Sequence, residues 1–129
     1  MFLIHRQKTS RMYGLPKTID LSFLSGRTLC QICIGEFQVQ FNFDARVRIH
    51  VENPFTYVDA NGMTEHVKTA PSSAGVVSNL IGKVTSEITP SDNGTLEVKF
   101  STGEKLILYD DNPAYECYTI RRGDQTIAV

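Results

Sequence analysis

Side chains able to do chemistry are scattered through this sequence rather than gathered in a known catalytic motif. The chain contains no G-x-S-x-G nucleophile elbow, no G-x-x-x-x-G-K-[ST] phosphate loop and no H-E-x-x-H zinc motif. Glu52, His50 and Asp111 could form a small-molecule or hydrolytic site if they met in a cleft between two halves of the fold. Nothing in their spacing requires that meeting, so we assign no catalytic residue.

A basic stretch offers a second kind of site. Arg46, Arg48 and His50 alternate with hydrophobic residues, so an extended chain places them on one face. The preceding stretch places Gln38, Gln40 and Asn42 beside them in the same way. This face would suit an acidic protein, or it is simply a solvated sheet face. Because no aromatic side chain is interleaved to stack a base, we do not expect nucleic acid as the partner.

The C-terminal part supplies further binding candidates. In an extended chain Glu116 and Tyr118 share one face, and Tyr115 lies on the other with Cys117. An acid beside an aromatic residue can anchor a protein ligand, whereas a tyrosine in a closing strand can equally fill the core with its hydroxyl at the rim. Asp111 precedes an Asn-Pro pair, where turn formation is the simpler role.

The three cysteines do not indicate a metal or redox site. Cys30 and Cys33 are three residues apart in a predicted strand, which directs their side chains to opposite faces, and only Cys117 remains as a third. We therefore expect buried, reduced, structural thiols in a cytoplasmic protein, with no metal and no cofactor.

Length and composition describe one ordinary soluble domain. The chain has 129 residues, 41% of them hydrophobic, and a formal net charge of -1. Such a balance gives no general attraction to nucleic acid or to anionic lipid. We find no signal peptide and no apolar run of the ~18 residues that a membrane span needs. Residues 1–17 carry bases before the first acid and are predicted to be a solvated basic arm preceding a single domain over 18–129.

Alternation with a period of two dominates the chain and predicts β-strands with one buried face. Three strands joined in an antiparallel meander are expected in each half, followed by a closing hairpin around Gly123-Asp124. The first meander turns at Gly35-Glu36, which places Phe37 on the buried face of the next strand. The predicted strands are 29–34, 37–43, 46–51, 83–88, 95–100, 105–109, 115–121 and 125–129.

The two halves, about 26–60 and 82–129, follow similar plans. Each meander ends in an acid-Asn-Pro corner, Glu52-Asn53-Pro54 in the first and Asp111-Asn112-Pro113 in the second. Proline cannot donate to a strand ladder, so each corner should stop the third strand and redirect the chain. One short helix over 71–82 is predicted between the halves. The expected fold is mainly β: two pseudo-repeated antiparallel meanders, related by duplication, that form a sandwich or a partly open barrel.

The second half resembles a family of small uncharacterised bacterial proteins. Residues 93–106 are similar to that family's DG-x-L hairpin, and residues 112–118 to its D-P-x-Y-E-A-W closing strand. Cys117 stands where the family has Ala, and Tyr118 where it has Trp. The resemblance covers about residues 14–129 and implies a fold rather than a chemistry. Some proteins of this type resemble immunity or accessory components of bacterial toxin systems.

These observations favour a non-enzymatic binding protein of the immunity-like kind, which would neutralise a toxin-like protein by direct contact. Its candidate binding residues are Arg46, Arg48, His50, Asp111, Tyr115, Glu116 and Tyr118. The alternative is a small-molecule-binding or hydrolytic protein with a site between the two halves. A third option is a homodimer formed through an exposed edge strand.

Overall fold

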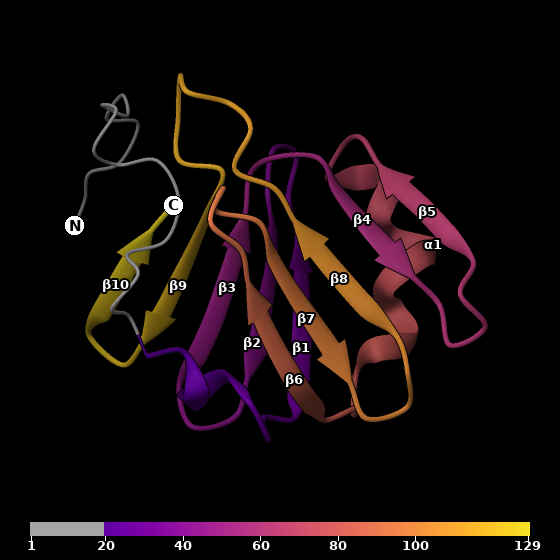
Figure 1. Cartoon of the computed structure of the whole chain (residues 1–129). Coiled ribbons are helices and arrows are strands. Elements are labelled where there is room, and N and C mark those ends of the chain that lie inside the picture. Colours follow the sequence, from indigo (N-terminus) through magenta and orange to yellow (C-terminus); the bar gives the residue numbers. More distant parts are fainter. Residues whose placement is uncertain (1–19) are drawn as a thin grey trace.

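The structure is a computed structural model that describes residues 20–129. They form two five-stranded antiparallel sheets that face each other without closing into a barrel (Figure 1). The first sheet, in spatial order, consists of β1 (Leu29–Ile34), β2 (Val39–Phe43), β3 (Val47–Val51), β9 (Tyr118–Arg122) and β10 (Gln125–Ala128). The second sheet, also in spatial order, consists of β5 (Thr64–Val67), β4 (Phe55–Val58), β8 (Lys105–Leu108), β7 (Leu96–Phe100) and β6 (Thr85–Pro90). The predicted mainly β sandwich is confirmed.

The core fills the space between the two sheets. Strands β2 and β7 have the same alternation of buried and half-buried residues, as their sequences predict. Phe41 of β2 meets Phe55 of β4 edge to face with ring centroids 6.0 Å apart, which joins the two sheets at their centre. Buried leucine, isoleucine and valine side chains surround this pair. One buried face on each sheet leaves the opposite faces for solvent or for partners.

Both acid-Asn-Pro corners carry the chain from one sheet to the other. Strand β3 ends in the first sheet before Pro54, and β4 begins in the second sheet directly after it. Likewise β8 ends in the second sheet, and β9 begins in the first after Pro113. The prediction that each corner stops a strand and redirects the chain is confirmed. Its consequence is that β4 and β5 join the sheet of the second meander, and β9 and β10 join the sheet of the first.

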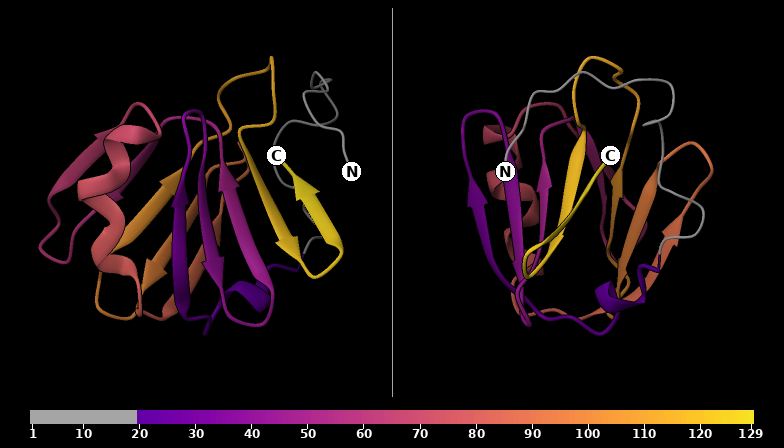
Figure 2. Two further views of the ribbon diagram at one scale, coloured as in Figure 1. Left: turned by 180° about the vertical axis from the view of Figure 1, so that it is seen from behind. Right: turned by 90° about the vertical axis from the view of Figure 1, so that its left-hand side faces the viewer.

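The segments that precede β1 and β6 form a junction between the two halves, and each donates an equivalent hydrogen bond to the other half. Gly26 N–H donates to the carbonyl of Thr85 at 2.9 Å, and Gly82 N–H donates to that of Leu29 at 2.7 Å. Both glycines have positive φ and follow a 3-10 turn, η2 (Ser22–Leu24) or η4 (Ser78–Leu80). Figure 2 shows the two meanders packed face to face around this junction. A tandem duplication of the halves stays a prediction.

The helical segment between the halves is less regular than a single helix. It consists of η3 (Pro71–Ser73), α1 (Ala74–Val77) and η4. No side chain caps α1, and Gly75 with two valines disfavours regular α-helix. Its buried residues Val77 and Leu80 attach the segment to the core, so packing rather than propensity holds it in place.

Strands β4 and β5 were not predicted from the sequence. Phe55, Thr56 and Tyr57 of β4 are buried in succession, so the strand lacks the alternation that marks the others. Thr56 faces outward, yet its hydroxyl is hydrogen-bonded to His66 Nδ1 and to the Tyr109 hydroxyl, both at 2.8 Å. These neighbours come from β5 and from the end of β8, and they cover a position that would otherwise be exposed.

The prediction for the first hairpin turn is wrong by one residue. Gly35 N–H donates to the carbonyl of Gln38 at 2.8 Å, so Glu36 and Phe37 are the central residues of the turn. Phe37 therefore lies outside β2 and is 77% exposed, instead of facing the core. A bulky aromatic residue at the tip of a turn contributes little to stability and is available to a ligand.

The cysteine prediction is also wrong in part. Cys30 and Cys33 are exposed, and only Cys117 is buried; none of the three is in a disulfide. The register between β1 and β2 shifts between Leu29 and Gln31, and this bulge holds Cys30. Cys33 then follows the polar outer face of the sheet. The predicted basic arm, residues 1–17, lies outside the described residues.

Candidate functional site

The outer face of the first sheet carries two rows of directly opposed residues, which we call the basic face. The strand registers define both rows. One row consists of Gln31, Asn42, Arg48, Arg121 and Thr126. The other consists of Cys33, Gln40, His50, Thr119 and Ala128. Neither row contains a carboxylate.

Arg48 and Arg121 lie directly opposite each other in the centre of the basic face. Arg48 is exposed and Arg121 half-buried, and neither makes an ion pair within residues 20–129. Like charges at directly opposed positions destabilise a sheet. The sequence did not single out Arg121, because β9 comes to lie beside β3 only through the second corner.

The second sheet also has an opposed pair of cations, between β7 and β8, and that pair is electrically balanced. There Lys99 and Lys105 also oppose each other, but Glu87 lies opposite Lys99, and Glu97 binds Lys105 at 3.2 Å. On the basic face the matching positions hold the neutral amides of Gln31 and Gln40. Those amides bond to Asn42 at 3.0 and 2.7 Å, not to an arginine. Arg48 and Arg121 therefore have no compensating carboxylate within residues 20–129.

His50 is half-buried between Gln40 and Thr119. Its Nε2 atom is buried and has no hydrogen-bond partner in the described structure. Burial lowers the pKa of His50, and the charges of Arg121 and Arg48 lower it further. The imidazole is accordingly neutral near pH 7, with a polar atom left unsatisfied.

We expect the stability of the fold to decline as the pH falls below the ordinary histidine pKa of 6.5. Below this pH, His50 of the unfolded chain binds a proton, whereas folded His50, with its lowered pKa, is still neutral. The free energy of unfolding that is present above this pH is therefore lost as the pH falls. Urea unfolding at pH 7.5 and 5.5 would measure the decline. His50→Gln should make it shallower, and equal declines in variant and wild type would contradict the assignment.

Arg46 does not belong to the rows of the basic face, contrary to the predicted strand. It lies in the β2–β3 turn, where both Ala45 and Arg46 have φ near +60°. Its guanidinium reaches Asp124 at 3.7 Å, and its carbonyl accepts the N–H of Gly123 at 3.1 Å. Arg46 thus joins two turns at one end of the sheet and leaves Arg48 and Arg121 as the central cations.

The C-terminal candidates are dispersed by the loop between β8 and β9. Tyr118 is buried, and its hydroxyl donates to the carbonyl of Gly94 at 2.6 Å. Burial raises the pKa of Tyr118 far above its ordinary value. Tyr118 is therefore a core residue that no partner can reach. Glu116 is half-buried and precedes the strand in which it was predicted.

Asp111 and Tyr115 are both hydrogen-bonded to Asn53 of the first corner. Asn53 Nδ2 donates to Asp111 Oδ1 at 2.7 Å and to the carbonyl of Tyr109 at 3.3 Å. The Tyr115 hydroxyl donates to Asn53 Oδ1 at 3.1 Å. Buried Asn53 thus ties the two crossings of the chain together. The sequence indicated only a turn residue at this position.

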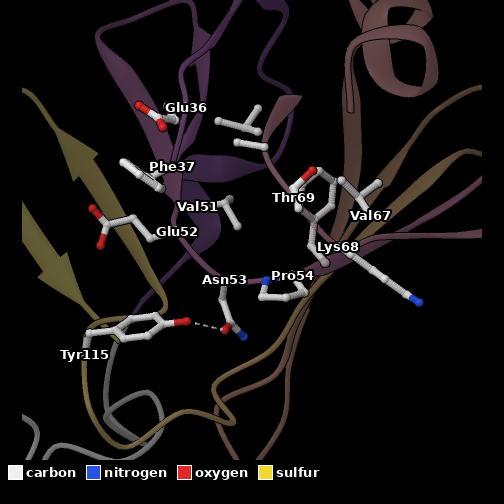
Figure 3. Close-up of a pocket in the computed structure, with 13 residues that line it drawn as sticks. Glu36, Phe37, Val51, Glu52, Asn53, Pro54, Val67, Lys68, Thr69 and Tyr115 are labelled. Carbon is white, nitrogen blue, oxygen red and sulfur yellow. Dashed lines mark hydrogen bonds between the residues drawn. The ribbon is translucent and has the colours of Figure 1, made fainter. Parts of the chain in front are cut away.

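A pocket of about 380 Å³ opens where the first corner passes between the sheets (Figure 3). It is lined by Glu36, Phe37, Val39, Val51, Glu52, Asn53, Pro54, Phe55, Val67, Lys68, Thr69, Ala70 and Tyr115. Of the three residues that the sequence suggested for a hydrolytic site, only Glu52 lines it. His50 lies on the basic face, and Asp111 is bound to Asn53. The three side chains do not converge on this pocket.

Within residues 20–129, no group of three or more His, Cys, Asp or Glu side chains could hold a metal ion. The helices of this region are all too short or too polar to cross a membrane.

Comparison with known proteins gives a family but no function. No curated protein and no solved structure matches the chain. The family DUF6188 matches residues 21–129, which include both sheets, both corners and the pocket. The chain therefore belongs to DUF6188, a family of unknown function.

Proposed function

We propose that this chain is a non-enzymatic binding protein that holds an acidic surface of a partner protein against its basic face. The observation that carries the proposal is the directly opposed pair of Arg48 and Arg121 without a compensating carboxylate. Such a pair raises the free energy of the unbound protein. A partner carboxylate placed between the two guanidinium groups would remove that cost.

The neighbouring residues suit the same partner. A carboxylate accepts two parallel hydrogen bonds from an arginine, which adds direction to the charge attraction. Asn42 lies opposite Arg48 on β2, and Thr119 lies two residues before Arg121 on β9, so neutral polar side chains surround the pair. An acidic protein surface presents several carboxylates over an area of this width.

We further propose that the partner is a toxin-like protein and that the chain neutralises it by contact in the cytoplasm, as an immunity protein does. The resemblance of residues 93–106 and 112–118 supports this finer proposal. Immunity by contact requires no reaction at the interface, only a tight and selective complex. A basic patch would also accelerate association with an acidic partner.

Affinity capture from the native host, followed by isothermal titration with the captured protein, tests the proposal. We expect Arg48→Glu with Arg121→Glu to weaken binding at least 100-fold, because two attractions become repulsions. Lys99→Glu with Lys105→Glu is the matched control, since it changes the net charge equally at the opposed pair of the other sheet. Equal losses for both variants would contradict the assignment of the face.

A variant that replaces one side-chain amide by a carboxylate gives a sharper test of partner binding at the basic face. Gln40→Glu introduces at the basic face the carboxylate that Glu97 supplies at the matching position of the second sheet. We expect this variant to fold normally and to bind the partner about 10-fold more weakly, a change of ~1.4 kcal/mol. Unchanged affinity would show that the partner does not use the arginine pair. Light scattering would show whether the captured partner is a second copy of this chain.

The hydrolytic alternative has no geometric support, because Glu52, His50 and Asp111 do not share the pocket. The small-molecule alternative keeps a specific observation in its favour, namely the pocket itself. It requires other residues than those that the sequence suggested.

A further inference from the structure

Strands β1 and β6 hold corresponding places at the edges of the two sheets. Each has six residues with the same pattern of exposure: one buried residue, two exposed, one half-buried and two exposed. Each strand also has an irregular register at its second residue. Because the backbones agree in these features, the two strands can be compared position by position.

The side chains at corresponding positions protect β6 but not β1. Sheet edges in soluble proteins are commonly blocked by a charge or by a proline, because either one hinders pairing with another strand. β6 has both, Glu87 at its third position and Pro90 at its sixth. β1 has neutral Gln31 and Ile34 there, and Ile34 is 39% exposed. The other two edge strands, β5 and β10, have only four residues each.

The outer side of β1 has main-chain groups available to a further strand. Gly35 N–H donates across the β1–β2 turn at 2.8 Å, and successive residues of an antiparallel strand bond alternately to one side and to the other. Cys33 therefore bonds toward β2, whereas the N–H and C=O groups of Ile32 and Ile34 point to the outer side. Leu29, before the bulge, bonds to the segment that precedes β6. Within residues 20–129, no strand lies beside the outer side of Ile32 and Ile34.

We propose that β1 pairs with β1 of a second copy of this chain across a two-fold axis, which joins the two first sheets into one continuous sheet. The added pair is antiparallel, as is every neighbouring pair in this sheet. With Cys33 opposite its counterpart, Ile32 of each copy lies opposite Ile34 of the other, and these two pairs form four main-chain hydrogen bonds. A register moved by two residues would place the bulge at Cys30 in the ladder and lose two of those bonds.

The distribution of charge favours a second copy as the occupant of this edge. Neither β1 nor β2 contains a charged residue, so the two copies meet through uncharged strands. Arg48 and its counterpart would lie five strand spacings apart, about 24 Å, which exceeds the Debye length of ~10 Å. Pairing through β10 would bring the two copies of Arg121, on neighbouring β9, to about 14 Å. The inference does not rest on the function proposed for the basic face.

Sedimentation equilibrium of the full chain under reducing conditions tests the proposal. We expect a monomer–dimer equilibrium at concentrations up to about 1 mM, because small interfaces associate weakly. Cys33→Lys should raise the dimer dissociation constant at least 10-fold, since it places two like charges directly opposite each other. Thr89→Lys is the matched control at the corresponding exposed position of β6 and should change the constant less than 2-fold. A chain that stays monomeric, species larger than a dimer, or equal effects of the two variants would overturn the proposal.

Ile34→Pro gives a second measurement that does not depend on charge. This variant gives β1 the residue that β6 has at the same position, where the fold accommodates it. It removes one donor from each copy, and so two of the four bonds between them, and should also raise the dissociation constant at least 10-fold. An unchanged constant in a folded variant would contradict the pairing. Arg48→Glu with Arg121→Glu should leave the constant within 2-fold, which separates this inference from the proposed function.

Oxidation with diamide tests the register. Opposed residues at a pair without main-chain hydrogen bonds have Cα atoms about 4.5 Å apart, a separation that a disulfide can span. The two Cys33 thiols would form one S–S bond between the copies, and diamide would accept the two electrons and two protons that they lose. We expect the cross-linked dimer to persist in Cys30→Ser and to disappear in Cys33→Ser. The reverse result would overturn the proposal.

Discussion

Lys83→Met is expected to lower the free energy of unfolding by ~3 kcal/mol, the largest effect of any single surface-charge change in this protein. Lys83 forms an ion pair with Glu104, whose side chain is only 4% exposed. Thr102 also donates its hydroxyl to Glu104. Without the ammonium group, Glu104 would remain a buried charge with one neutral side-chain donor. Urea unfolding at pH 7 measures the loss.

The same pair predicts how the loss depends on pH. Burial by itself raises the pKa of Glu104, but hydrogen bonds from Lys83, from Thr102 and from the backbone together lower it below its ordinary 4.5. In the wild type, the stability from Glu104 is therefore present above pH 4.5 and is lost as the pH falls through the lowered pKa. In Lys83→Met fewer hydrogen bonds oppose the effect of burial on the pKa of Glu104. The difference in free energy of unfolding between the variant and the wild type should therefore become smaller at acidic pH.

An exposed ion pair provides the control for this prediction. Lys105 binds Glu97 at 3.2 Å, with both side chains more than a third exposed. Lys105→Met should cost no more than ~1 kcal/mol, because water replaces the lost partner. Lys83→Met with Glu104→Leu should recover most of the stability, since no buried charge remains. Equal losses for the two lysine variants would contradict the role of burial.

Asn53→Ala is expected to lower the free energy of unfolding by ~2 kcal/mol. The variant removes one amide that serves three groups: the Asp111 carboxylate, the Tyr109 carbonyl and the Tyr115 hydroxyl. All three belong to the second half of the chain. The loss should therefore appear as weakened attachment between the two crossings, with faster amide exchange in residues 109–117.

The asparagine of the other corner is the matched control. The side-chain oxygen of Asn112 accepts a local bond from the N–H of Ala114 at 2.9 Å. Asn112→Ala should cost less than ~1 kcal/mol. Combined with Tyr115→Phe, Asn53→Ala should show a coupling energy above ~0.5 kcal/mol, because the two side chains share one hydrogen bond. Additive losses would show that the corners are not tied through this contact.

Much of the fold could be predicted from the sequence, because its strongest signals are local. The alternation in residues 39–43 and 96–100 determines which side chains face the core, and the two proline corners determine where strands must end. These signals depend on neighbours within one strand or one turn. They led to the mainly β sandwich, to both meanders and to the outward position of Arg48.

The candidate sites could be predicted only in part, because they depend on contacts between distant segments. Arg48 was identified as a candidate, but its opposition to Arg121 exists only because the second corner delivers β9 to the edge of β3. For Tyr118 the sequence left a binding role and a core role open, and its burial with the contact to Gly94 in another hairpin decides for the core. Strand β4 went unpredicted since His66 and Tyr109 cover its outward Thr56.

By itself the sequence determined the strands that pair with their neighbours along the chain and the two points at which they stop. Only the tertiary structure decided which sheet each crossing strand joins. Alternation specifies which face of a strand is buried, but it does not specify the partner that buries it. That partner is set by how the two corners, joined through Asn53, direct the chain. The same crossings create both the uncompensated arginine pair and the pocket.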